Sequence, residues 1–175
     1  MTPQNEIRLR RIQRIAKVMR VVCKYFLATI VLGMVAIVIA LIVGHDGSVG
    51  VFSIWFKVSD LTHGGRMLVG VFALATFGVM LKFFFHLHRL MKYYSRTEIF
   101  TMQSAMQIRK MGICCALCGG FEMLWPYVPR LVLANPPRTL MGNGGGVLLI
   151  GLVIIVLSWF MSIAAEMQEE NALTV

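Results

Sequence analysis

The stretch that decides the fold is Tyr25–Gly44, YFLATIVLGMVAIVIALIVG, in which no residue carries a charge. A second uncharged stretch, TLMGNGGGVLLIGLVIIVLSWFMSIAA, runs from Thr139 to Ala165. A helix needs about 20 apolar residues to cross the hydrocarbon core of a membrane, where every backbone polar group must be satisfied by the chain itself. Weaker apolar runs lie around Met67–Leu87 and Met111–Leu133. The sequence therefore predicts an all-α, four-helix transmembrane bundle.

Composition supports a single unit of this kind. The chain has 175 residues, of which 58% are hydrophobic and only 14% are charged. This leaves room for one compact unit and too little polar surface for a soluble domain. We therefore expect one integral membrane domain over residues 1–175. Its predicted spans are about 25–44, 67–87, 111–133 and 146–165, with the base of a cytoplasmic hairpin at 88–110.

The basic residues lie mainly on the segments that would share one side of the membrane. The net charge is +9, and thirteen of the 17 Lys and Arg residues precede the first span or surround the central connection. Only Lys57, Arg66, Arg130 and Arg138 fall on the other side. Because cytoplasmic loops carry an excess of Lys and Arg, we expect an N-in/C-in orientation. The same placement explains the charge without direct nucleic-acid binding.

Residues 7–24 predict a basic amphipathic helix on the cytoplasmic side before the first span. Its basic residues recur at spacings of three and four, while its apolar residues gather on another face. The basic stripe consists of Arg10, Arg14, Lys17, Arg20 and Lys24. One interpretation is docking of a protein partner or an anionic lipid, and the other is anchoring in the headgroup layer.

The central connection contains a candidate helix start. Thr97 or Thr101 could serve as the N-cap of the third helix, because a hydroxyl can accept a hydrogen bond from a free N–H of the first turn. The second and third helices would then form a hairpin whose base projects into the cytoplasm. Further along, Trp125-Pro-Tyr-Val-Pro129 predicts a break in the third helix.

Three short motifs carry a resemblance to a known family. They are Tyr94–Thr101 (YSRTEIFT), Ile108–Gly112 (IRKMG) and the tail Glu169–Val175 (EENALTV). With four spans in matching places, the chain resembles the bacterial membrane proteins catalogued as domain of unknown function 2975. One departure is Arg96 or Thr97, where the family often has Gly. The resemblance implies a protein of the bacterial inner membrane without established catalysis, and an association with small helix-turn-helix regulators.

Glu122 is the one acidic residue deep in a predicted span. Because an ionisable group in hydrocarbon costs at least a few kcal/mol, we expect Glu122 to face the interior of the bundle. It should border a row of small residues, Gly112, Ala116 and Gly120, where another helix would approach. A hydrogen bond to Thr76 or Ser158 is one role for it, and a proton or ligand site is the other.

Potential metal ligands lie at one depth on the second and third helices. Thiolate and imidazole groups bind zinc and other transition metals, so a site between these helices is conceivable, but the spacing is unspecific. The candidates are His86, His88, Cys114, Cys115 and Cys118. No histidine lies at mid-membrane depth to bind haem, and no catalytic motif is present. We therefore expect no cofactor, reduced cysteines and no enzymatic activity.

The cytoplasmic face is the predicted contact surface. It combines the basic stripe, the Ile-Phe-Thr motif and the acidic tail, which we expect to meet the N-terminal helix through ion pairs. The named residues are Arg10, Arg14, Lys17, Arg20, Ile99, Phe100, Thr101, Glu169 and Glu170. The leading hypothesis is a sensor or regulator that holds a protein partner. The alternatives are an accessory subunit of a larger membrane complex, and a small transporter or redox protein that uses Glu122.

Overall fold

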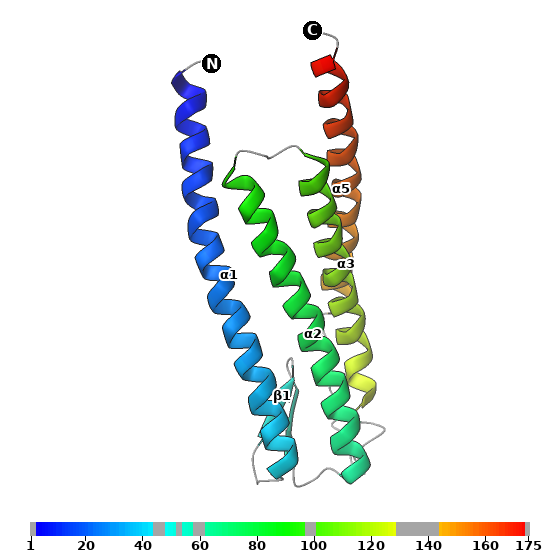
Figure 1. Ribbon diagram of the computed structural model, residues 1–175. Helices are drawn as coiled ribbons and strands as arrows, with labels where there is room; N and C mark the ends of the chain where they lie inside the picture. Colours follow the sequence, from blue (N-terminus) through cyan, green and yellow to red (C-terminus); the bar gives the residue numbers. More distant parts are fainter. Residues whose placement is uncertain are drawn as a thin grey trace.

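Most of the residues that the structure describes lie in long helices (Figure 1). The computed structural model describes residues 3–43, 48–51, 54–57, 62–96, 101–128 and 144–173, with side chains for 11–43, 62–96, 101–128, 144–167 and residue 170. Within these residues the long helices are α1 (Pro3–Val43), α2 (His63–Tyr94), α3 (Met102–Leu124) and α5 (Gly144–Leu173). The predicted all-α class with four long helices is confirmed.

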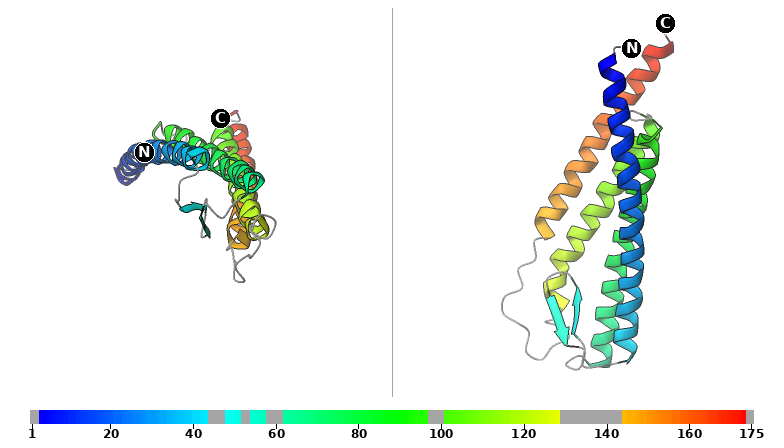
Figure 2. Two further views of the ribbon diagram at one scale, coloured as in Figure 1. Left: turned by 90° about the horizontal axis from the view of Figure 1, so that it is seen from below. Right: turned by 90° about the vertical axis from the view of Figure 1, so that its left-hand side faces the viewer.

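The four helices stand side by side in chain order. Helix α1 contacts α2, α2 contacts α3, and α3 contacts α5. Seen from below, they form a curved row with α1 and α5 at its two ends (Figure 2). Along the helix axes, the start of α1, the end of α5 and the α2–α3 turn all lie towards the same end of the molecule (Figure 1). We call this end the basic end, because it carries the cations of the N-terminal segment and of the central connection.

Helix α1 is continuous from Pro3 to Val43. The predicted N-terminal amphipathic helix is therefore the first part of α1 and not a separate element. No Gly or Pro occurs between residues 4 and 32, so nothing in the sequence interrupts the backbone hydrogen bonds. At 1.5 Å per residue its 41 residues extend over about 60 Å, twice the thickness of a hydrocarbon core.

Helices α2 and α3 extend into the predicted central connection. Helix α2 begins after its N-cap Thr62, whose hydroxyl accepts from the Gly65 N–H at 3.2 Å, and it continues to Tyr94. Helix α3 begins after Thr101. The hairpin base expected over residues 88–110 is therefore mostly helical, and the turn itself is short. The prediction placed its boundary where the apolar run ends, but hydrogen bonding continues beyond that point.

Helix α3 ends inside the span predicted over residues 111–133. It stops at Leu124 and is followed by a single 3₁₀ turn, η2 (Trp125–Tyr127). Pro126 is the physical reason, because it has no N–H to donate to the carbonyl of Glu122 and its ring would clash with that carbonyl. The predicted break at Trp125–Pro129 is confirmed as far as residue 128, and residues 129–133 lie outside the described ranges.

Three of the described helices are long and apolar enough to cross a membrane. They are Arg11–Val43, His63–Tyr94 and Gly144–Met167. Helix α3 is less apolar because it carries Arg109, Lys110 and Glu122. Large apolar side chains of the other helices are exposed, as at Ile42 (78%), which is expected when lipid is the solvent. A crossing by α3 and the N-in/C-in orientation stay predictions.

A small antiparallel hairpin follows α1 and was not predicted. Strands β1 (Ser48–Val51) and β2 (Ile54–Lys57) pair in register, with Ser48 opposite Lys57 and Val51 opposite Ile54. Along the helix axes, the hairpin lies at the end of the molecule opposite the basic end (Figure 2). Val, Ile, Phe and Trp at these positions favour strands.

The tightest packing joins α3 to α5. A Cβ added to Gly119 would lie 2.7 Å from the Leu148 Cα, and one added to Gly112 would lie 3.0 Å from the Gly151 carbonyl oxygen. The two backbones therefore touch, which is typical of small residues at helix contacts in membranes. Gly112 lies in this contact as predicted. Gly120 does not, because a Cβ there would meet nothing within 4 Å, and Gly119 takes its place.

An aromatic cluster joins α2 to α3 away from the basic end. The Phe72 ring lies 5.3 Å from the Phe121 ring, edge to face, and 5.1 Å from the Trp125 ring. Trp125 is almost fully buried at 1% exposure. Such pairs add about 0.5–1.5 kcal/mol each to the burial of their area. This cluster holds the end of α3 against α2 where the helix stops.

Candidate functional site at the basic end

The α2–α3 turn is fixed by hydrogen bonds at both of its ends. At the end of α2, the Ser95 N–H donates to the Met91 carbonyl at 3.0 Å, and the Ser95 hydroxyl donates to the Lys92 carbonyl at 2.8 Å. At the start of α3, Thr101 and Ser104 form a reciprocal capping box, each side chain accepting from the other's N–H at 3.2 Å. Of the two predicted caps, Thr101 is the one observed.

Arg20 ties α1 to this turn. Its guanidinium donates to the Ser95 hydroxyl, across a sequence separation of 75 residues. Arg14 and Lys17, further along the predicted basic stripe, are exposed. Among the described side chains of the stripe, Arg20 joins two helices, and Lys24 is exposed like Arg14 and Lys17. The sequence pattern alone treated these residues as equivalent.

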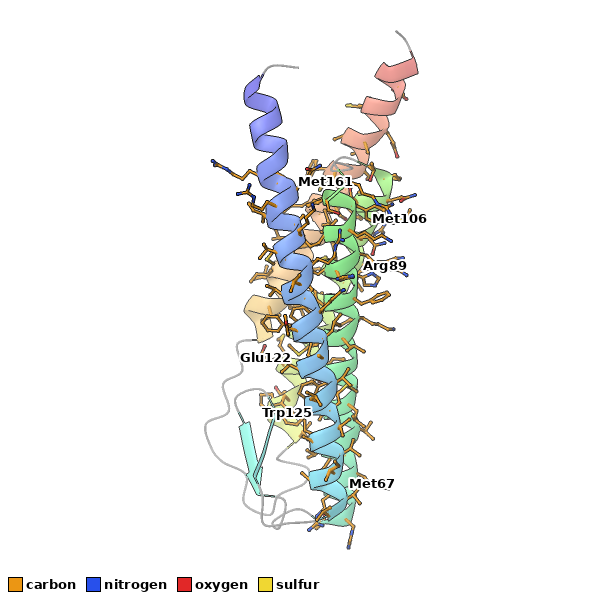
Figure 3. The ribbon with its side chains drawn as sticks, turned by 60° about the vertical axis from the view of Figure 1, so that its left-hand side comes forward. Met67, Arg89, Met106, Glu122, Trp125 and Met161 are labelled. Atoms are coloured by element: carbon orange, nitrogen blue, oxygen red, sulfur yellow. The ribbon has the colours of Figure 1, made fainter. Side chains whose placement is uncertain are left out.

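A polar hollow of about 840 Å³ opens beside the turn. Its cations come from the end of α2: Arg89 and Lys92 lie three positions apart on the last two turns, and Arg96 lies two residues beyond the helix. The start of α3 supplies the opposite wall. The hollow is lined by Arg89, Lys92, Tyr93, Arg96, Thr101, Met102 and Gln103. Figure 3 shows Arg89 and Met106 towards the basic end of the molecule and Met67 at the opposite end.

No carboxylate is among the described residues that line the hollow. The Arg89 guanidinium is positioned by the Phe85 ring, with its central carbon 4.6 Å from the ring centroid. The N-terminus of α3 adds the partial positive charge of its unpaired N–H groups. The hollow therefore concentrates positive charge from two helices. Sequence reasoning missed it, although the 89, 92, 96 spacing repeats the pattern that identified the N-terminal stripe.

The predicted metal ligands point towards different helices. His86 Nδ1 lies 2.8 Å from the Gln107 Oε1 of α3, whereas His88 faces α1 beside Arg20 and Lys24. Two residues apart on a helix correspond to about 200° of rotation, so the two rings diverge. Within the described residues, no group of three or more His, Cys, Asp or Glu side chains is close enough to hold a metal ion.

The cysteines serve different contacts. All four are free thiols. Cys23 is 1% exposed, Cys114 is 7% exposed, and Cys115 donates to the Val147 carbonyl of α5 at 3.6 Å. Cys115 and Cys118 are neither fully buried nor exposed. They occupy positions where a small apolar residue packs between helices.

Glu122 is half-buried and does not make the predicted hydrogen bond. The Thr76 hydroxyl donates to the Phe72 carbonyl at 2.9 Å, and the Ser158 hydroxyl donates to the Ile155 carbonyl at 2.6 Å. Helices α3 and α5 run in opposite directions with Gly119 against Leu148, so Ser158 lies several turns away from Glu122. The hydroxyl groups of Thr76 and Ser158 thus donate within their own helices.

The remaining predicted contact residues are divided between described and undescribed segments. Thr101 is the N-cap of α3, and the Glu170 side chain is exposed on the last turns of α5. Ile99 and Phe100, and the side chains of Arg10 and Glu169, lie outside the described residues. Helices α1 and α5 stand at opposite ends of the row (Figure 1), so the ion pairs expected between tail and stripe stay a prediction.

These features define a class of protein: a helical membrane protein whose cations gather at one end. The chain belongs to the family described as protein of unknown function DUF2975, whose model matches residues 21–175. The predicted resemblance is therefore confirmed. No curated protein and no solved structure matches the chain. The matched region covers all four long helices except the first part of α1.

Proposed function

We propose that this protein is a non-enzymatic membrane protein that acts through protein contacts at its basic end, as a sensor or regulator in the bacterial inner membrane. The observation that carries the proposal is that three structural features lie towards that end of the molecule. They are the exposed cations Arg14 and Lys17, the capped α2–α3 turn, and the last turns of α5. The positive-inside rule assigns this end to the cytoplasm.

The part of the molecule away from the basic end supports a scaffold role. Several hydroxyl groups donate to nearby carbonyls of their own helices, as those of Thr76 and Ser162 do at 2.9 and 2.8 Å. Its contacts are made by glycines and aromatic rings, and its outward surface is apolar. Exposed cations on an otherwise lipid-facing molecule favour recognition of an acidic partner surface, because complementary charge steers association.

Purification of the tagged full chain in a mild detergent tests this proposal. We expect a protein partner to be retained at a fixed ratio by the wild-type chain and lost from the Arg14→Glu/Lys17→Glu variant. The matched control, Arg14→Lys/Lys17→Arg, conserves the charge and should retain the partner. Retention by the charge-reversed variant would contradict the proposal.

The identity of the retained protein separates the leading hypothesis from its alternative. A DNA-binding regulator supports a regulatory role. A respiratory or transport complex supports the role of an accessory subunit. Both readings place the contact at the basic end, so the charge-reversal result applies to each.

A further inference from the structure

We propose that the hollow beside the α2–α3 turn binds the phosphate group of an anionic lipid. Its cations gather at the end of α2: Arg89 and Lys92 lie within the last two turns of that helix, and Arg96 lies two residues beyond its last residue, Tyr94. Two of the three are guanidinium groups, which bind phosphate oxygens in a bidentate manner. The inference goes beyond the protein contacts proposed above and is independent of them.

The opposite wall of the hollow also favours an anion. Thr101, Met102 and Gln103 are the N-cap and first two residues of α3. The capping box uses the N–H groups of Thr101 and Ser104, so it leaves those of Met102 and Gln103 without an intrahelical acceptor. Helix N-termini with such groups bind phosphate. Cations from α2 and N–H groups from α3 therefore converge on one space from two sides.

The expected depth of the hollow in the membrane favours a lipid as the source of the phosphate. Helix α2 has 32 residues and is about 48 Å long, whereas a hydrocarbon core is about 30 Å thick. If the apolar part of α2 occupies the core, Arg89–Arg96 lies in the layer of lipid headgroups. Tyr93 in the same wall is a residue type enriched at this boundary. The hollow, about 840 Å³, is larger than a bare phosphate needs and has room for a glycerophosphate headgroup.

Native mass spectrometry of the full chain tests the proposal directly. The protein is released from mixed micelles that contain phosphatidylglycerol and phosphatidylcholine in equal amounts. We expect the wild-type chain to retain phosphatidylglycerol preferentially. Equal retention of the two lipids would overturn the proposal, and this arm depends on no variant.

Two matched variants locate the site. Arg89→Gln/Lys92→Gln/Arg96→Gln removes the cations of the hollow, and Arg14→Gln/Lys17→Gln/Lys24→Gln removes three exposed cations of α1 at the same end. We expect about a tenfold loss of retained phosphatidylglycerol for the first variant and less than about a twofold loss for the second. Circular dichroism and size-exclusion chromatography check that both remain folded. Equal losses would show diffuse attraction to the basic end and would contradict a site in the hollow.

Two further arms distinguish other anions. An excess of inorganic phosphate should leave most of the bound lipid in place, and complete displacement would assign the hollow to a free phosphate ion instead. A polyglutamate peptide should compete poorly, and stronger binding of the peptide than of the lipid would assign the hollow to an acidic protein segment.

Discussion

The contact between α3 and α5 and the contact between α1 and α2 are built in opposite ways. In the first, backbones touch: Gly119 leaves no space for a side chain against Leu148, and Gly151 leaves none against Ala116. In the second, side chains make the contact: Ala16, Cys23 and Ile30 are buried along one line of α1. The Phe26 and Phe84 rings stack there at 5.1 Å.

The difference indicates how the molecule divides into a firm and an adaptable part. Backbone contacts cannot be relaxed by a change of rotamer, whereas side-chain contacts can. We therefore expect α3 and α5 to behave as a fixed pair, and α1 to be the helix that adjusts. Since α1 carries Arg14, Lys17 and the Arg20–Ser95 link, a movement of α1 would change the arrangement of these cations and of the turn at the basic end.

The largest effect is expected at the glycine contact. Gly119→Ala places a methyl group 2.7 Å from the Leu148 Cα and should lower the free energy of unfolding by about 1–3 kcal/mol. Gly120→Ala is the matched control, because its methyl group meets nothing within 4 Å, and the change should be within about 0.5 kcal/mol. Reversible unfolding in mixed micelles measures both. Equal losses would show that the two backbones do not touch at Gly119.

A smaller effect is expected between α1 and α2. Cys23 is 1% exposed, and Cys23→Leu should lower stability by about 1 kcal/mol, because neighbouring side chains can yield. Val22→Leu, on a position 36% exposed, is the control and should be neutral. Hydrogen exchange followed by mass spectrometry should show faster exchange in α1 alone. Faster exchange in α5 as well would argue against two separable parts.

The link between Arg20 and Ser95 should couple α1 to the turn more weakly. A double-mutant cycle with Arg20→Gln and Ser95→Ala should give a coupling free energy of about 0.5–1 kcal/mol. The same cycle with Lys17→Gln in place of Arg20→Gln should give none, because Lys17 is exposed. Thermal unfolding in one detergent supplies all values. Coupling of equal size in both cycles would mean that charge alone, and not the hydrogen bond, connects the helices.

The smallest effect is expected at Glu122. This residue belongs to α3 but lies outside the glycine contact with α5, and it is half-buried. Glu122→Gln should change the free energy of unfolding by no more than about 0.5 kcal/mol. A loss above about 1.5 kcal/mol would show that the carboxyl group is a structural partner after all. Loss of a transport or redox activity with unchanged stability would revive the third functional hypothesis.

The features that the sequence predicted well are those that local chemistry decides. An uncharged run predicts a membrane helix whatever its neighbours are, which is why α1, α2 and α5 were found. Thr101 as N-cap and Pro126 as a helix breaker depend on hydrogen bonding within a few residues. The helix ends were less well predicted, because α2 and α3 continue through polar residues that hydropathy excludes.

The features that were missed depend on how helices are rotated against each other. Gly119 and Gly120 differ by about 100° on α3, and a single sequence does not show which one meets α5. His86 and His88 face different neighbours for the same reason. The hollow combines residues of α2 with the start of α3, so neither segment alone reveals it. Only the capped turn between them brings the two walls together.

The central claim is that the start of α1, the α2–α3 turn and the end of α5 form one face in the cytoplasm. Labelling of single cysteines with a membrane-impermeant maleimide tests it most directly, in a chain whose native cysteines are replaced. The positions are Arg14→Cys, Gln103→Cys and Glu170→Cys at the basic end and His63→Cys at the other, all of them exposed. We predict that only His63→Cys is labelled in intact cells and that the other three are labelled after permeabilisation. Labelling of Gln103→Cys from outside, with Arg14→Cys protected, would contradict the account.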